Sequence, residues 1–153
     1  MKRALMGIGV CVALAVPATA SGALKTFSGK VNGGGKIGIE ADVVAGNATA
    51  VTELRYKRVR AHCSEIGGAA FQVAFELNMP VNGNNRFSLD SDYPGGHLLF
   101  KGVFRRHARR VNGLFKDRFE FEGHTCSTGE RRYRASRGPL PNVGAKRALR
   151  LAP

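Results

Sequence analysis

Several residue types and motifs are scarce or missing in this 153-residue chain. It has no tryptophan, three tyrosines and three cysteines, and its 11 acidic side chains stand against 24 basic ones. So few tryptophan and tyrosine rings leave little of the flat aromatic surface on which sugar rings and bases stack. The sequence also contains no G-x-S-x-G nucleophile elbow and no H-E-x-x-H or H-x-x-E-H zinc motif. The enzyme classes that these motifs mark are therefore disfavoured.

The most apolar stretch lies at the start of the chain and is too short to span a bilayer comfortably as a helix. Lys2 and Arg3 precede 13 apolar residues, Ala4–Val16, and the small residues Ala18-Thr19-Ala20 follow. This layout is typical of a secretory signal peptide with an A-x-A cleavage site. We expect residues 1–20 to be removed, leaving an extracytoplasmic protein that begins at Ser21 and has no transmembrane segment.

Signal cleavage also decides what the cysteines can do. It removes Cys11 and leaves Cys63 and Cys126 in an oxidising compartment, where we expect them to form a disulfide. The bridge would close a loop of 63 residues, and the chain-entropy estimate gives it about 4 kcal/mol of stabilisation.

Two histidines lie close to these cysteines in the sequence. His62 and His124 could form a two-histidine metal site, completed by Glu65 or Glu122. Their spacing matches no zinc motif, and bridged sulfurs cannot act as thiolate ligands. We therefore expect no metal and no cofactor, with His62 and His124 as the only metal candidates.

Hydrophobic periodicity predicts the fold class. Apolar residues of one parity recur in several segments: Ile37, Ile39, Ala41 and Val43; Phe71, Val73, Phe75, Leu77 and Met79; and Phe115, Phe119 and Phe121. Period-two patterns between turn residues indicate strands that are buried on one face. We expect a monomeric all-β domain over residues 21–137, an antiparallel β-sandwich or barrel of about eight strands with one disulfide. Residues 138–153 are expected to form a disordered basic tail.

One charged residue breaks this alternation. Asp117 falls among the inward positions of its segment, between Phe115 and Phe119. Either a bulge turns its side chain outward, or Asp117 is a partly buried carboxylate that needs a partner.

Acidic residues offer the main route to catalysis. Three pairs share a strand face, which would allow the carboxylate separations of glycosidases; they are Glu40 and Asp42, Asp90 and Asp92, and Glu120 and Glu122. Alternating charges are, however, ordinary on the wet face of a sheet. The sequence thus favours a non-enzymatic protein. A small extracytoplasmic hydrolase is one alternative, and a structural or protein-interaction module, marked by an exposed apolar patch, is another.

Basic residues are concentrated late in the chain. Residues 101–153 carry fourteen basic and four acidic side chains, against eight and seven in residues 21–100. Three clusters are candidate binding residues: Arg55, Lys57, Arg58 and Arg60; Arg105, Arg106, Arg109 and Arg110; and Arg131, Arg132 and Arg134, with Arg137 beside them.

Such clusters suit phosphate, sulfate and carboxylate groups. An exported protein without a nucleic-acid-binding signature is not expected to meet intracellular nucleic acid. The leading hypothesis is a secreted, non-enzymatic β domain whose arginine-rich face binds an anionic envelope or extracellular polymer, or lipid head groups. The alternative is a face that only keeps the protein soluble.

Short motifs add a resemblance. They are Cys63, Gly102-Val103-Phe104, Gly113-Leu114-Phe115, Cys126-Ser127-Thr128-Gly129 and Tyr133-Arg134-Ala135. Over about residues 24–137 the chain is similar to small secreted all-β domains of high-GC Gram-positive bacteria, which have no settled function. The resemblance implies an exported, disulfide-bearing, sandwich-like domain and carries over no catalytic residues.

Overall fold

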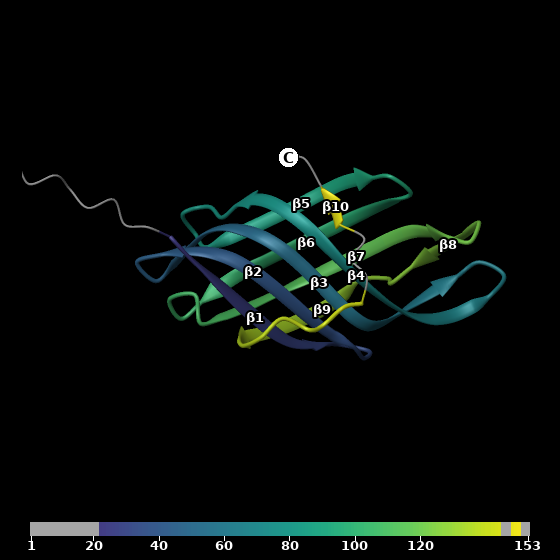
Figure 1. Ribbon diagram of the computed structural model, residues 1–153, viewed down its shortest axis with the longest axis horizontal. Helices are drawn as coiled ribbons and strands as arrows, with labels where there is room; N and C mark the ends of the chain where they lie inside the picture. The colour runs from purple at the N-terminus through teal and green to yellow at the C-terminus, as the bar shows by residue number, and fades with distance from the viewer. Residues whose placement is uncertain (1–21, 145–147, 151–153) are drawn as a thin grey trace, which may run out of the picture.

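The computed structural model of the protein describes residues 22–144 and 148–150 (Figure 1). The predicted signal peptide, residues 1–20, lies outside the described residues. Ten strands occur in the described part of the chain: β1 (Ala23–Val31), β2 (Lys36–Val44), β3 (Asn47–Cys63), β4 (Gly67–Pro80), β5 (Arg86–Tyr93), β6 (Gly96–Arg105), β7 (Arg110–Phe121), β8 (His124–Ser127), β9 (Arg131–Arg137) and β10 (Ala148–Arg150).

The strands form one sheet in the order β10-β4-β3-β2-β1-β9-β7-β6-β5. All pairings are antiparallel except that of β10 with β4. β8 pairs with both β3 and β7. Following paired strands from β3 through β2, β1, β9, β7 and β8 therefore leads back to β3. The predicted all-β antiparallel fold is therefore confirmed.

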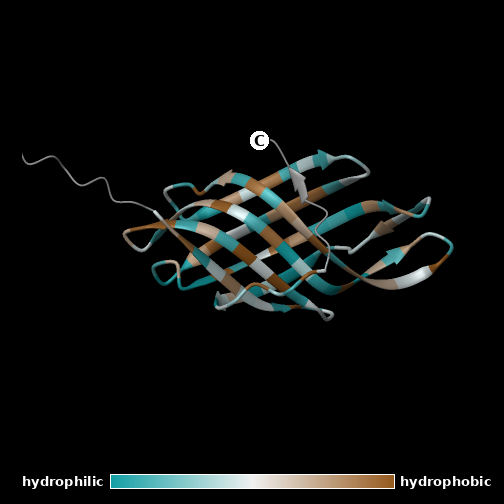
Figure 2. Cartoon of the chain, in the orientation of Figure 1, coloured by the Kyte–Doolittle hydropathy of each residue, from teal (hydrophilic) through white to brown (hydrophobic). Residues whose placement is uncertain are grey.

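The core lies on the inner face of this curved sheet. Figure 2 shows hydrophobic and hydrophilic residues alternating along the strands. The four predicted inward residues of β2, Ile37 to Val43, are all buried, as are Phe75, Leu77 and Met79 of β4. Ring contacts connect the strands, and Tyr56 of β3 stacks on Phe115 of β7 with centroids 5.5 Å apart. The period-two pattern thus identified the buried face correctly.

The disulfide joins β3 to β8. Cys63 and Cys126 lie directly opposite each other in the ladder, and their bond confirms the predicted pairing. Both are buried together with Ala61, and Phe71, Phe119 and Phe121 pack around them. The bridge therefore holds a small apolar cluster beside the main core.

Asp117 is a buried carboxylate, the second of the two alternatives that its position allowed. It is fully buried opposite Leu98, and β7 pairs with β6 without a register shift. Its Oδ2 accepts a hydrogen bond of 2.6 Å from the Tyr56 hydroxyl, and its Oδ1 accepts one of 2.6 Å from Tyr93. Burial raises the pKa of Asp117, although both phenol hydrogen bonds act in the opposite direction.

Within the disordered tail predicted over residues 138–153, the structure describes residues 138–144 and 148–150, whereas residues 145–147 and 151–153 lie outside the described residues. Residues 138–144, called the strap below, cross the outer face of the sheet. Gly138 donates its N–H to the Thr26 carbonyl of β1, and Val143 is buried. A Cβ atom at position 38 of β2 would lie 2.3 Å from Pro141, but Gly38 has none. This glycine lets the strap pack directly on β2, a contact that composition does not reveal.

Candidate anion-binding face

A row of cations crosses four neighbouring strands on the outer face. Lys57 of β3 pairs with Lys36 of β2, Lys36 with Lys30 of β1, and Lys30 with Arg134 of β9. Residues directly opposite in a ladder project from the same face with Cβ atoms about 5 Å apart. Lys57 is half-buried and the other three are exposed. These four residues are called the cationic row.

Further cations flank this row. Arg132 lies two positions from Arg134 on β9, and Arg110 of β7 lies opposite Ser136 of the same strand. Both arginines are exposed. Arg55 lies two positions from Lys57, but its guanidinium is bound to the Glu53 carboxylate by hydrogen bonds of 2.6 and 3.0 Å, which raise the pKa of Arg55. Arg55 therefore contributes less free positive charge than its neighbours.

A bulge in β3 adds Arg58 to the same face. The register with β4 shifts between Lys57 and Val59, and Arg58 is the extra residue, with a φ of 54°. Val59 is fully buried, whereas Arg58 is exposed. A bulge inserts one extra residue into a strand, so two consecutive side chains can both point away from the core. Lys57 and Arg58 consequently both lie outside the core.

Three members of the cationic row and Arg58 line a hollow of about 590 Å³ at the β1–β2 turn. Its lining residues are Lys30, Val31, Gly34, Gly35, Lys36, Lys57, Arg58, Pro141 and Asn142. None of these described lining residues is acidic, and the strap supplies Pro141 and Asn142. This hollow is called the basic hollow below.

A second basic hollow, of about 560 Å³, lies at the opposite end of β2 from the first one. It is lined by Gly46, His107, Arg109, Arg110, Ser136 and Arg137. Arg137 is also bound within the fold, because its Nε donates to the Ala108 carbonyl at 2.7 Å and its guanidinium lies 4.8 Å from the Phe27 ring centre. Burial and the nearby Arg109 lower the pKa of Arg137.

The structure divides the predicted arginine clusters between different surroundings. Arg132 and Arg134 join the face, whereas Arg131 turns to the β3 side, where its NH2 donates to the Arg60 carbonyl at 3.1 Å. Arg105 pairs with Arg110 beside the β6–β7 turn, and Arg106 lies in that turn with a φ of 53°.

Sequence clustering missed two members of the cationic row, Lys30 and Lys36. Each is isolated from other cations along the chain, although only five residues separate them. The signal that could have found them is the pairing of β1 with β2 as a hairpin, which places the two lysines opposite each other.

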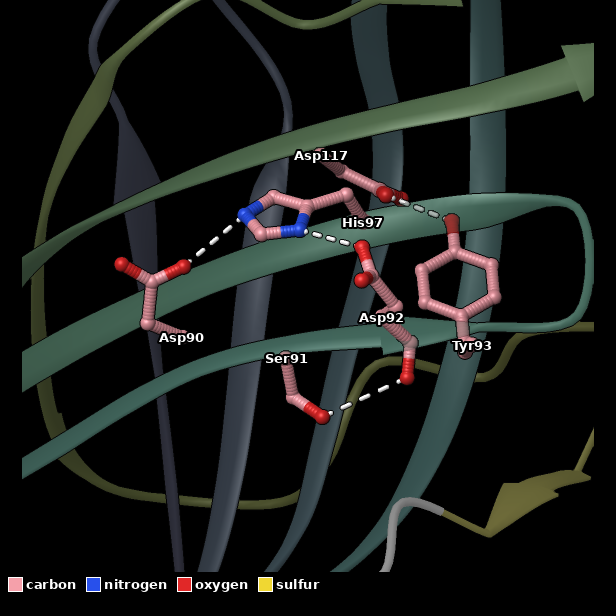
Figure 3. A network of polar contacts seen from close by, with 6 residues as sticks. All are labelled: Asp90, Ser91, Asp92, Tyr93, His97 and Asp117. Atoms are coloured by element: carbon pink, nitrogen blue, oxygen red, sulfur yellow. Dashed lines mark hydrogen bonds and ion pairs between the residues drawn. The ribbon is translucent and has the colours of Figure 1, made fainter.

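The acidic pair Asp90 and Asp92 surrounds a histidine on the β5–β6 hairpin (Figure 3). His97 Nε2 lies 2.8 Å from Asp90 Oδ1, and His97 Nδ1 lies 2.7 Å from Asp92 Oδ1. The hydrogen bond to Asp92 is the largest cause that raises the pKa of His97. Both carboxylates are thus occupied by one imidazole on an exposed surface, an arrangement that holds the hairpin rather than leaving two carboxylates free around a substrate.

Other predicted acidic and metal-binding residues are dispersed. Glu40 accepts a hydrogen bond of 3.1 Å from Thr52. His124 Nδ1 lies 3.5 Å from Glu65 Oε2, while His62 pairs with Ser127 on the neighbouring strand. Among the described residues, no group of three or more His, Cys, Asp or Glu side chains is arranged to hold a metal ion.

Comparison with protein-family models, with curated proteins and with solved structures finds no match to this chain. The resemblance to small secreted all-β domains therefore stays a prediction. The described part of the chain contains no helix with the length and apolarity needed to span a bilayer.

Proposed function

We propose that this protein is an exported, non-enzymatic β domain that binds an anionic envelope or extracellular polymer through its cationic row and the arginines beside it. The observation that carries the proposal is the register of Lys57, Lys36, Lys30 and Arg134 across four adjacent strands. Like charges directly opposite each other destabilise a sheet. The repulsion among these four cations would be relieved by a bound anion that neutralises them.

The spacing of the row suits a linear polymer. Neighbouring strands are about 4.8 Å apart, so four cations on adjacent strands present charge at regular short intervals over roughly 14 Å. A chain of phosphate, sulfate or carboxylate groups can contact several of them together. The Cys63–Cys126 disulfide is compatible with the extracytoplasmic location that the proposal requires.

The test compares two lysines of the same strand. Lys30 belongs to the row, whereas Lys25 is exposed but has the opposite parity on β1, opposite the buried Ala41. The disulfide-bonded mature protein is titrated with long-chain polyphosphate, dextran sulfate and polyglutamate at low and high salt. We expect binding that weakens steeply with salt.

Among the variants, Lys30→Gln should weaken binding by about three- to tenfold, because it removes one ionic contact, and Lys25→Gln should bind like the wild type. No binding to any of the three polymers at low salt would contradict the proposal. Equal weakening by the two substitutions would show that net charge, and not this face, governs binding.

A further inference from the structure

The basic hollow draws its charged side chains from three neighbouring strands. Lys30 comes from β1, Lys36 from β2, and Lys57 and Arg58 from β3. We propose that this hollow is a phosphate site, which takes a phosphate-bearing group with at least two negative charges. This inference rests on the proposed function and deepens it, because it names the chemistry of the group that binds at one end of the cationic row.

The charge of the hollow favours a multiply charged ligand. Its lining includes four cationic side chains and no acidic one among the described residues. A single monovalent group would leave most of this charge uncompensated, whereas a phosphomonoester or a diphosphate carries two or more charges in a compact volume. Arg58 adds a planar guanidinium fork, which binds two phosphate oxygens at once, and the lysines act as point charges.

The number of donors that line the hollow favours a phosphate over a single carboxylate. Three adjacent strands supply the cations, and Asn142 of the strap also lines the hollow. A phosphate presents oxygens toward several sides, whereas a carboxylate offers two oxygens in one plane. The five lining residues with side-chain donors can therefore bind more oxygens of a phosphate than of a single carboxylate.

Backbone features hold the walls of the hollow in place. The bulge at Arg58 keeps both Lys57 and Arg58 out of the core, as described above. Gly35 has a φ of 96°, and a Cβ there would lie 2.8 Å from the Arg58 carbonyl oxygen. The β1–β2 turn thus packs directly against the bulge because Gly35 lacks a side chain. The cations are attached to a fixed frame and not to a loose loop.

Arg58 also permits a sharp experiment. Its left-handed backbone conformation is one that asparagine adopts readily, so Arg58→Asn removes the charge without opposing the fold. Arg106 offers a matched control, because it is an exposed arginine with a φ of 53° that does not line the hollow. The disulfide-bonded wild type, Arg58→Asn and Arg106→Asn are compared for urea midpoint and then titrated calorimetrically with tripolyphosphate and with citrate.

We expect tripolyphosphate to bind the wild type and Arg106→Asn alike, and to bind Arg58→Asn about tenfold more weakly, since one charge-assisted contact is lost. Citrate, a tricarboxylate of somewhat lower charge, should bind the wild type at least about tenfold more weakly than tripolyphosphate. Equal affinity for citrate and tripolyphosphate would overturn the phosphate assignment. Equal affinity of Arg58→Asn and Arg106→Asn would overturn the assignment of the site to this hollow.

Comparing the binding of long polymers with that of tripolyphosphate distinguishes this inference from the proposed function. If all long polyanions bind with steep salt dependence but tripolyphosphate binding does not depend on Arg58, the phosphate site is overturned and the polymer function stands. If tripolyphosphate binding depends on Arg58 but no long polymer binds, the polymer function is overturned. In that case the hollow is a site for a free phosphate compound.

Discussion

Lys30 of β1 lies directly opposite Arg134 of β9, although one residue is near the start of the domain and the other near its end. The pairing of the first and last long strands creates this contact. The resulting cluster of positive charges lies on the outer face of the sheet. No single segment of the chain contains this cluster. The stability of the sheet and the affinity of its face for anions should therefore change in opposite directions when this charge is altered.

A substitution at Lys36 tests this opposition between stability and anion affinity most clearly, because Lys30 and Lys57 lie on either side of Lys36. Lys36→Gln removes two repulsive cross-strand pairs and should raise the free energy of unfolding by about 0.3–1 kcal/mol at low salt. The gain should shrink in 0.5 M NaCl, where exposed charges are screened. Urea denaturation at the two salt concentrations measures it. A loss of stability at low salt would mean that the row is not under electrostatic strain.

The disulfide should supply a large share of the stability of the domain. Replacing Cys63 and Cys126 together by serine releases a loop of 63 residues and should lower the free energy of unfolding by about 4 kcal/mol. Denaturant titration of the oxidised wild type and the double variant checks this. A difference below about 1 kcal/mol would mean that the core alone holds β3 and β8 together.

Asp117 should give the protein a distinctive pH dependence. Burial raises its pKa, so the folded state holds the proton to a higher pH than the unfolded chain does. Its contribution to stability is fully present below the pKa of about 3.9 in the unfolded chain and declines as pH rises through the raised folded value.

Asp117→Asn removes this titration and keeps a side chain that can hydrogen-bond to Tyr56 and Tyr93. The stability of the wild type relative to the variant should fall between pH 4 and pH 8, as measured by urea denaturation at a series of pH values. A relative stability that rises over this range would show that the two tyrosine hydrogen bonds outweigh burial.

His97 should titrate above its usual range, and Asp92 should matter more than Asp90. The hydrogen bond to Asp92 is the largest cause of the raised pKa. In NMR titrations of the imidazole ring, Asp92→Asn should lower the pKa of His97 more than Asp90→Asn does. The opposite ranking would assign the main interaction to Asp90.

We expect the same network to make only a small contribution to the free energy of unfolding. The charged pairing is present below the unfolded pKa of about 6.5 and is lost as pH rises through the raised folded pKa. His97→Gln should therefore cost less than about 1 kcal/mol at pH 5, because the group is exposed to solvent. It should cost less still at a pH above the folded pKa. Denaturation at both pH values tests this, and a larger loss at high pH would contradict the account.

Local patterns were sufficient to predict the fold class and the disulfide. The alternation from Ile37 to Val43 identified a buried strand face, and Cys63 and Cys126 form the disulfide that was predicted for them. The same parity separates Arg131 from Arg132 and Arg134, which the structure places on different sides. Such features depend on neighbouring residues alone, and the sequence displays them directly.

The candidate site depends on long-range geometry that the sequence does not display. The register that brings Lys30 to Arg134 requires the pairing of distant strands, and the exposure of Arg58 depends on a bulge opposite Phe71 and Gln72. The strap was missed because its proline and glycine content resembles that of a disordered tail. Its anchoring depends on the missing Cβ of Gly38, a property of another strand.

The salt dependence of binding to long-chain polyphosphate tests the central claim most directly. Each ionic contact contributes roughly 0.7–0.9 to the slope of log K against log salt concentration. The four cations of the row therefore predict a slope of about −3, and contacts to the arginines beside the row make it steeper. Lys30→Gln should reduce the steepness of this slope by about 1, and Lys25→Gln should leave it unchanged. A flat slope, or the same slope for Lys30→Gln and Lys25→Gln, would contradict the claim that the cationic row binds the polymer.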